Sequence, residues 1–216
     1  MKDFASQPPV TAETLLRAYM AGIFPMAESR DDPDMFWVEP RLRGIIPVDG
    51  FHISRSLARA MRRPGWETTL NADFGGVLAG CAARPETWIS EGLAQLYHEL
   101  HLAGFAVSQE VWRDGRLVGG VYGVSLGGAF FGESMFSAER DASKVALAVL
   151  MFRLRRAGFT LFDTQFVTPH LSSLGAVEIP KAEYKERLAT ALALRPSSLF
   201  PEPELHEVMQ RRTQTS

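Results

Sequence analysis

Apolar residues recur at the spacing of an α-helix in six segments of the 216-residue chain. Residues that favour helix ends flank several of them: Thr11, Ser90 and Asp141 are suited to the N-cap, and Gly158 follows a last turn. The segment after Asp141 carries apolar residues on two faces, which predicts a helix that is buried on two sides. The expected helices cover residues 11–21, 52–63, 73–82, 90–103, 141–157 and 180–193.

A strand-like pattern fills residues 105–136. Two strand-like segments flank Asp114-Gly115, which is one of the strongest hairpin signals, and a third follows the turn-like residues 125–128. The pattern therefore predicts an antiparallel meander of three strands. Shorter strands are expected at residues 35–38, 43–47, 159–162 and 177–179.

The order of these elements predicts an α+β protein, with helices and sheet sharing one core. We expect a smaller N-terminal α+β unit over residues 1–82 and a larger domain over residues 83–216, and a loosely ordered tail after Pro196. No internal repeat divides the chain further.

Composition narrows the function. Apolar residues make up 46% of the chain, and the net charge of −2 excludes a globally basic nucleic-acid binder. Neither a transmembrane run nor the apolar core of a signal peptide is visible, so no membrane partner and a cytoplasmic location are expected. The single cysteine, Cys81, excludes an intramolecular disulfide and is interpreted as a small buried apolar residue.

Positive charge is concentrated in one region despite the net negative charge. Six arginines and a single acidic residue, Asp49, occur between Arg41 and Arg63. On the helix expected there, the arginines lie away from the apolar stripe, which suits contact with phosphates. The alternative is a solvated helix face. The candidate residues are Arg55, Arg59, Arg62 and Arg63.

Several common sites are absent from the sequence. There is no GxxxxGK[ST] phosphate loop and no GxGxxG motif between a strand and a helix, so neither a nucleotide nor any other cofactor is expected. The run Gly132–Phe136 lacks the last glycine of a nucleophile elbow, which disfavours a serine hydrolase. His98 and His101 have no HExxH pattern, so no metal site is expected.

The remaining polar candidates follow or interrupt apolar strands. Glu133 lies in the third strand of the meander, and Asp163 with Gln165 follows the strand at 159–162. Two residues apart on a strand, Asp163 and Gln165 are expected to point to one side, unless Asp163 only caps the next turn. Trp88 either seals the core or lines a pocket.

Six motifs in the same order resemble the leucyl/phenylalanyl-tRNA–protein transferase family, over roughly residues 15–190. They are Gly22–Met26; Trp37 with Pro40 and Arg43–Pro47; His52–Leu57; Leu117–Val124; Gly132–Ser137 with Ala142–Lys144; and Phe162–Gln165 with His170, Leu171 and Ser173–Ala176.

The resemblance implies a small N-terminal domain and an acetyltransferase-like (GNAT-type N-acyltransferase) domain. It also implies transfer of Leu or Phe, and less well Met, from aminoacyl-tRNA to the N-terminal Arg or Lys of acceptor proteins, which marks them for N-end-rule degradation. The activated ester needs no ATP, which agrees with the missing phosphate loop. A monomer is expected.

The resemblance also implies roles for individual residues. Asp163, oriented with Gln165, would accept or relay the proton of the attacking amine, and Glu133 would recognise the acceptor's basic residue or its ammonium. The arginine face would contact the tRNA acceptor stem. The apolar pocket for the donor side chain would be lined by Trp88, Phe130, Met135 and Leu147.

Two alternatives remain at this stage. A coenzyme-A-dependent N-acetyltransferase would need a glycine-containing phosphate-binding loop before the central helix, but residues 137–142 hold no glycine and two acidic residues. A non-catalytic tRNA-binding module would need only the arginine face.

Overall fold

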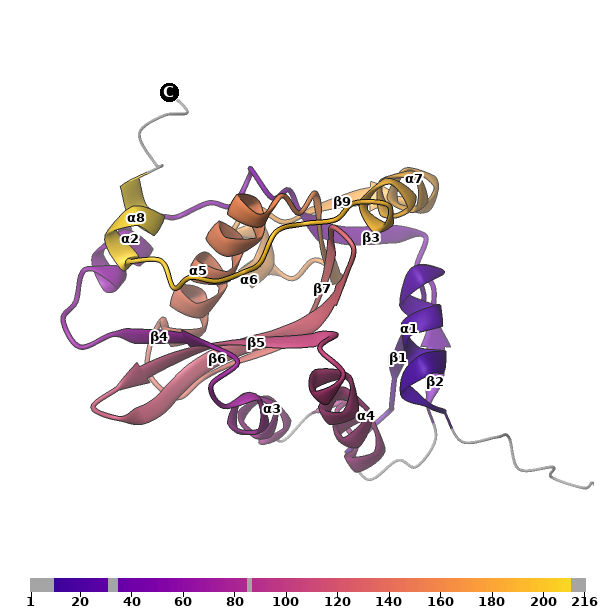
Figure 1. Ribbon diagram of the computed structural model, residues 1–216, viewed down its shortest axis with the longest axis horizontal. Helices are drawn as coiled ribbons and strands as arrows, with labels where there is room; N and C mark the ends of the chain where they lie inside the picture. Colours follow the sequence, from indigo (N-terminus) through magenta and orange to yellow (C-terminus); the bar gives the residue numbers. More distant parts are fainter. Residues whose placement is uncertain (1–9, 31–34, 85–86, 211–216) are drawn as a thin grey trace, which may run out of the picture.

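The computed structural model describes residues 10–30, 35–84 and 87–210, and its centre is a seven-stranded sheet (Figure 1). The strand order is β4-β5-β6-β7-β8-β3-β9. All neighbouring pairs are antiparallel except β7 and β8, which are parallel. The strands are β3 (Leu42–Ile46), β4 (Glu67–Leu70), β5 (Ala106–Arg113), β6 (Arg116–Leu126), β7 (Ala129–Ser137), β8 (Leu161–Gln165) and β9 (Val177–Pro180).

The predicted meander is confirmed as β5, β6 and β7. Asp114 and Gly115 form the two-residue turn between β5 and β6, and both have positive φ angles, 51° and 71°. This conformation matches the right-handed twist of the two strands, which explains the strength of the Asp-Gly signal.

Helix α5 (Ala142–Ala157) connects the parallel strands β7 and β8 and packs on one face of the sheet. Eleven of its sixteen residues are buried, so the predicted two-sided burial is confirmed. Helices α3 (Phe74–Ala82) and α4 (Glu91–Leu102) cover the other face (Figure 1). Cys81 in α3 is buried, as expected.

The N-terminal elements lie beside α4 at one end of the molecule (Figure 1). Helix α1 (Ala12–Met20), capped by Thr11, is followed by β1 (Phe24–Met26) and β2 (Phe36–Val38), which form a separate two-stranded sheet. The predicted domain boundary between residues 82 and 83 divides the strands of the large sheet. Strands β3 and β4 come before this boundary in the sequence, and the other five strands come after it.

Some predicted elements differ from the structure. Strands β1 and β4 were not expected, because their three and four residues carry no clear alternation of apolar and polar positions. The expected helix at 52–63 is shorter, since α2 (Arg55–Met61) begins only after its N-cap Ser54.

The tail after Pro196 also differs, because the prediction of loose order was wrong for its described residues, 197–210. The buried guanidinium of Arg153 donates hydrogen bonds to the carbonyl oxygens of Leu199 (2.6 Å) and Pro201 (3.0 Å). The tail continues into α8 (Leu205–Gln210), where Val208 is buried against the α5 side of the core. Two further helices complete the described fold, α6 (Pro169–Ser172) and α7 (Lys181–Leu192). In these residues no helix is both long and apolar enough to cross a membrane.

Candidate active site

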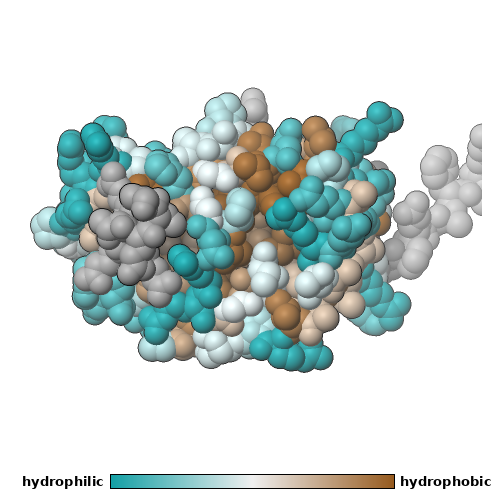
Figure 2. Space-filling model, turned by 90° about the horizontal axis from the view of Figure 1, so that it is seen from above, coloured by the Kyte–Doolittle hydropathy of each residue, from teal (hydrophilic) through white to brown (hydrophobic). Residues whose placement is uncertain are grey.

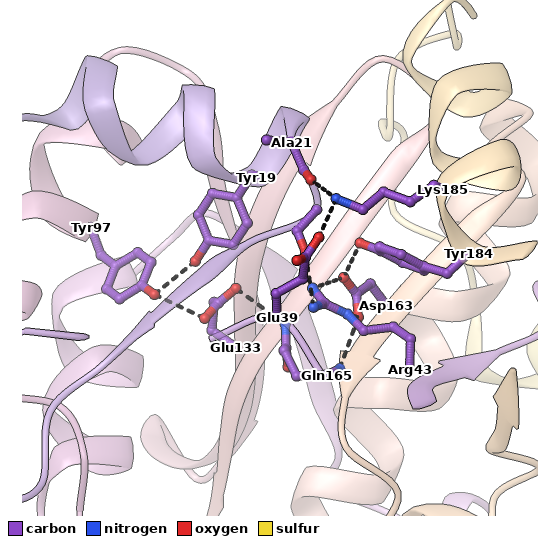
Figure 3. Close-up of polar contacts among 11 residues, drawn as sticks. Tyr19, Ala21, Glu39, Arg43, Tyr97, Glu133, Asp163, Gln165, Tyr184 and Lys185 are labelled. Carbon is purple, nitrogen blue, oxygen red and sulfur yellow. Dashed lines mark hydrogen bonds and ion pairs between the residues drawn. The ribbon is translucent and has the colours of Figure 1, made fainter. Parts of the chain in front are cut away.

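The parallel strands β7 and β8 pair only at their beginnings. Their ladder ends where Phe131 lies opposite Asp163, although β7 continues to Ser137. Beyond this point Glu133 of β7 and Gln165 of β8 face each other across the opening (Figure 3). The predicted polar residues therefore meet where two strands separate.

Both strands carry one extra residue at this place. In the ladder between β6 and β7, Glu133 has no partner residue, and in the ladder between β3 and β8 the unpaired residue is Thr164. Such β-bulges bend a strand and change the direction of nearby side chains. Gln165 also has a positive φ of 59°. The prediction that Asp163 and Gln165 point to one side was therefore wrong: Asp163 points toward Arg43, and Gln165 toward Glu133 (Figure 3).

The carboxylate of Asp163 is completely buried and accepts four hydrogen bonds. Arg43 donates two of them, from Nε to Oδ1 (2.9 Å) and from Nη2 to Oδ2 (2.6 Å). The hydroxyl of Tyr184 donates to Oδ2 (2.6 Å), and the backbone N–H of Gln165 to Oδ1 (2.8 Å). The last bond is the turn cap considered as an alternative, so Asp163 both caps the turn and binds a buried cation.

Sequence reasoning did not predict the role of Arg43. The residue is 1% exposed. Its guanidinium lies over the rings of Phe24 (4.5 Å) and Tyr184 (4.6 Å), and donates to the carbonyl oxygen of Gly22 (3.2 Å). Burial alone would lower the pKa of Arg43, but the adjacent Asp163 carboxylate raises it above its usual value, so the guanidinium stays charged. The only available signal was an arginine within a short strand-like segment, two residues before the apolar pair Ile45 and Ile46.

Glu133 has a different environment. Its Oε2 accepts a hydrogen bond from the hydroxyl of Tyr97 (2.8 Å), which is bonded in turn to the hydroxyl of Tyr19 (2.8 Å; Figure 3). Burial raises the pKa of Glu133 to about 7, although hydrogen bonds from the two tyrosines lower it. Burial also raises the pKa of both tyrosines well above 10, so they remain protonated donors.

The amide of Gln165 can be placed in two orientations, because oxygen and nitrogen have nearly the same shape. In one, Nε2 donates to Oε1 of Glu133 over 3.5 Å. In the other, the nitrogen donates to the carbonyl oxygens of Gly132 (2.9 Å) and Thr164 (3.0 Å). The second orientation satisfies the amide better and turns its oxygen toward Glu133, so two acceptors converge on the opening.

The structure does not bring the four predicted donor-pocket residues together. Phe130 and Leu147 are fully buried in the core on the α5 side, and Met135 packs against the same cluster. Trp88 belongs to the cluster on the other face, where its ring contacts that of Tyr97 edge-on at 6.3 Å. The sheet therefore separates Trp88 from the other three.

Apolar side chains are nevertheless exposed close to the polar centre. Phe166 directly follows β8, and its ring contacts that of Phe24 edge-on at 5.6 Å. Phe166, Leu42 of β3 and Val177 of β9 are 45%, 50% and 44% exposed. Figure 2 shows apolar surface gathered near the middle of the face seen from above.

The four predicted tRNA-contacting arginines are all exposed. Arg55 and Arg59 lie in α2, Arg62 caps its C-terminus and Arg63 follows. Within the described ranges none of the four forms an ion pair with a carboxylate. Helix α2 lies at the end of the molecule opposite α1 (Figure 1).

The first backbone amides of α5 already donate hydrogen bonds to other groups of the chain. Asp141 has a left-handed conformation (φ 72°) and does not cap the helix with its side chain, contrary to expectation. The N–H of Ser143 donates to Oγ of Ser137 (3.1 Å), and the N–H of Ala142 to the carbonyl of Glu139 (3.1 Å). These amides are therefore not free to bind a pyrophosphate.

Comparison with known proteins decides the family. The family model described as leucyl/phenylalanyl-tRNA protein transferase matches residues 45–189, and the model of its N-terminal domain matches residues 9–41. The chain belongs to the leucyl/phenylalanyl-tRNA–protein transferase family. Members of this family transfer an amino acid from aminoacyl-tRNA to a protein, and this chain is such an aminoacyltransferase. The alternative of a non-catalytic tRNA-binding module is thereby excluded.

Relatives of this transferase cover nearly its whole length. A leucyl/phenylalanyl-tRNA–protein transferase of Cereibacter sphaeroides (strain ATCC 17025) is 60% identical over 97% of this chain and 99% of its own. One from Ruegeria sp. (strain TM1040) is 59% identical over 96% and 99%. Among solved structures, FemX is similar in fold, with a TM-score of 0.51 at 12% identity over 80% of this chain and 68% of its own.

Proposed function

We propose that this transferase moves Leu or Phe, and less well Met, to the N-terminal Arg or Lys of proteins, and so marks them for N-end-rule degradation. The observation that supports a cationic acceptor is the position of Glu133. Its carboxylate and the amide of Gln165 converge where β7 and β8 separate, whereas the carboxylate of Asp163 is already neutralised by Arg43. An ammonium or a basic side chain would complement this pair of acceptors.

In this proposal Gln165 contacts the attacking amine, and Asp163 acts through it. The carboxylate of Asp163 binds the backbone N–H of Gln165 and thereby fixes the left-handed residue whose amide faces the opening. Correct positioning of two reactants accounts for a large share of the barrier reduction in such transfers. Asp163 is thus a positioning residue, and Gln165 a catalytic one.

The donor side chain would enter an apolar pocket formed by Phe130, Met135 and Leu147 on the α5 side of the sheet, and Trp88, which lies on the other face, would not take part. Because Phe130 and Leu147 are fully buried, this pocket requires side-chain movement on binding. One methylene discriminates between apolar donors by only about 1–3 kcal/mol, so some transfer of Met is expected.

The tRNA would be held through phosphates by Arg55, Arg59, Arg62 and Arg63, which have no carboxylate partner within the described ranges. We further propose an acetyltransferase-like (GNAT-type) catalytic part, supported by the parallel β7–β8 pair joined through the buried α5. A monomer in the cytoplasm, where charged tRNA is available, completes the proposal.

The acceptor class is tested with labelled leucyl-tRNA and peptides that differ only in their first residue. Peptides beginning with Arg or Lys are expected to be labelled roughly 10- to 100-fold faster than one beginning with Glu, because the Glu133 carboxylate attracts a basic side chain and repels an acidic one, a difference of about 1.5–3 kcal/mol. The measurement is the initial rate of label incorporation. Equal rates for all three peptides would show that the acceptor proposal is wrong.

Coenzyme A is expected not to bind at micromolar strength, because the first amides of α5 already bond to Ser137 and Glu139. Titration calorimetry of the full chain with coenzyme A measures this directly, with aminoacyl-tRNA as the positive control. A dissociation constant in the micromolar range would restore the acetyltransferase alternative.

A further inference from the structure

We propose that Glu133 is the group that takes the proton from the acceptor's α-ammonium, and that Tyr97, backed by Tyr19, is a positioning residue that aims its carboxylate. This inference rests on the proposed function, because it specifies which group of the acceptor meets Glu133. It assigns the proton transfer to a different carboxylate from Asp163.

Access to the opening distinguishes the two carboxylates. Asp163 has no exposed surface, and its two oxygens receive four donors, two of them from Arg43. Protonation of Asp163 would leave a buried guanidinium without its counter-charge, which is energetically costly. Glu133 is only partly buried, and its Oε1 faces the opening beside Gln165. An incoming amine therefore reaches Glu133 directly.

Residues of three elements, β7, α4 and α1, orient the Glu133 carboxylate. The bulge in β7 turns the residue out of the regular ladder. Tyr97 of α4 then binds Oε2, and Tyr19 of α1 holds the hydroxyl of Tyr97. Because Oε2 is occupied in this way, Oε1 is the oxygen left for the amine.

The charged surroundings of Glu133 agree with this role. Three tyrosines face it: Tyr97 of α4, Tyr19 of α1 and Tyr122 of β6. Two charged side chains also influence its pKa, which Asp163 of β8 raises and Arg43 of β3 lowers. Burial raises the pKa of Glu133 to about 7, so both of its protonation states are populated near neutral pH. A general base works best when its pKa lies near the working pH.

The proton balance of the transfer is complete without a further reagent. The α-ammonium gives one proton to Glu133, and the neutral amine attacks the ester carbonyl carbon of the aminoacyl-tRNA. A C–N bond forms, the C–O bond to the ribose breaks, and a second proton moves from nitrogen to the ribose oxygen. Glu133 then releases its proton to solvent before the next turnover.

Tyr122 offers a matched control for Tyr97. Its ring lies 5.3 Å from that of Tyr97 and is equally buried, but its hydroxyl has no hydrogen-bond partner among the described residues. Removing this hydroxyl changes the same apolar cluster without changing the bonds of Glu133.

The test is the pH dependence of kcat/KM for the Arg-peptide at saturating leucyl-tRNA, because this ratio reports the pKa of Glu133 before the peptide binds. Glu133→Gln is expected to lower kcat by about 10²–10⁴ and to remove the acid limb near pH 7. Tyr97→Phe removes a bond that lowers the pKa of Glu133, so its acid limb is expected at higher pH than in the wild type. Tyr122→Phe is expected to keep the wild-type limb. Thermal unfolding shows whether each variant is folded.

The possible outcomes separate this inference from the proposed function. If the wild type labels no Arg- or Lys-peptide, the proposed function is wrong. If it labels them but Glu133→Gln raises KM and leaves kcat unchanged, then Glu133 only binds the acceptor and the inference is overturned. The inference is also overturned if the acid limb of Tyr97→Phe lies at the same pH as in the wild type. It is overturned as well if the limb of Tyr122→Phe shifts as far as that of Tyr97→Phe.

Discussion

Replacing Arg43 with methionine is expected to lower the free energy of unfolding by about 3–5 kcal/mol and to abolish transfer. The change removes the partner of a fully buried carboxylate, and an uncompensated buried charge costs this much. It also removes the bond to the carbonyl of Gly22, which connects α1 and β1 to the large sheet. Denaturant unfolding measures the stability, and label incorporation into an Arg-peptide measures the transfer.

The double variant Arg43→Met with Asp163→Asn separates the two effects. It removes both charges of the pair, so most of the lost stability is expected to return. Transfer is expected to stay low, because the amide of Asn is a weaker acceptor for the backbone N–H of Gln165 than the carboxylate. A single variant that loses less than about 1 kcal/mol, or a double variant that is less stable than the single one, would contradict the assigned role of this buried pair.

Replacing the four exposed arginines at α2 with glutamine is expected to weaken aminoacyl-tRNA binding roughly 100-fold at low salt. Each phosphate contact adds about 0.7 (single strands) to 0.9 (duplex DNA) to the magnitude of the slope of log affinity against log salt concentration, so loss of four contacts should reduce this magnitude by roughly 3 to 4. The measurement is the dissociation constant of leucyl-tRNA over a salt series. The residues are Arg55, Arg59, Arg62 and Arg63.

A pairwise comparison provides the control. Arg62→Gln with Arg63→Gln is expected to reduce the slope by about 2. Arg116→Gln with Arg195→Gln, which alters two exposed arginines on other segments, is expected to leave it unchanged. If both pairs behave alike, the arginines at α2 form only a solvated surface, which was the alternative considered from the sequence.

Local signals in the sequence predicted most of the fold. Capping by Thr11 and Ser90, the Asp114-Gly115 turn and the burial of α5 each depend on residues close together in the chain, and each is confirmed. Strands β1 and β4 could not be predicted in this way, because their pairing partners, rather than their own few residues, define them.

The sequence suggested candidate site residues but not their geometry. Glu133, Asp163 and Gln165 were identified as candidates, but the direction of each side chain depends on a bulge, and a bulge is a property of two paired strands. The partnership of Arg43 with Asp163 spans 120 positions, so no local pattern indicated it. Phe130 and Leu147 show the opposite difficulty, because apolar residues look alike in sequence whether they line a pocket or fill a core.

The place of β3 in the sheet has a consequence during protein synthesis. This strand leaves the ribosome early, but its two neighbours, β8 and β9, are made more than a hundred residues later. Until then Arg43 has no counter-ion, and β3 has no ladder to join. Long-range pairing of this kind comes late in folding. An unfinished copy of the enzyme therefore has no assembled site with which to consume the charged tRNA that surrounds the ribosome.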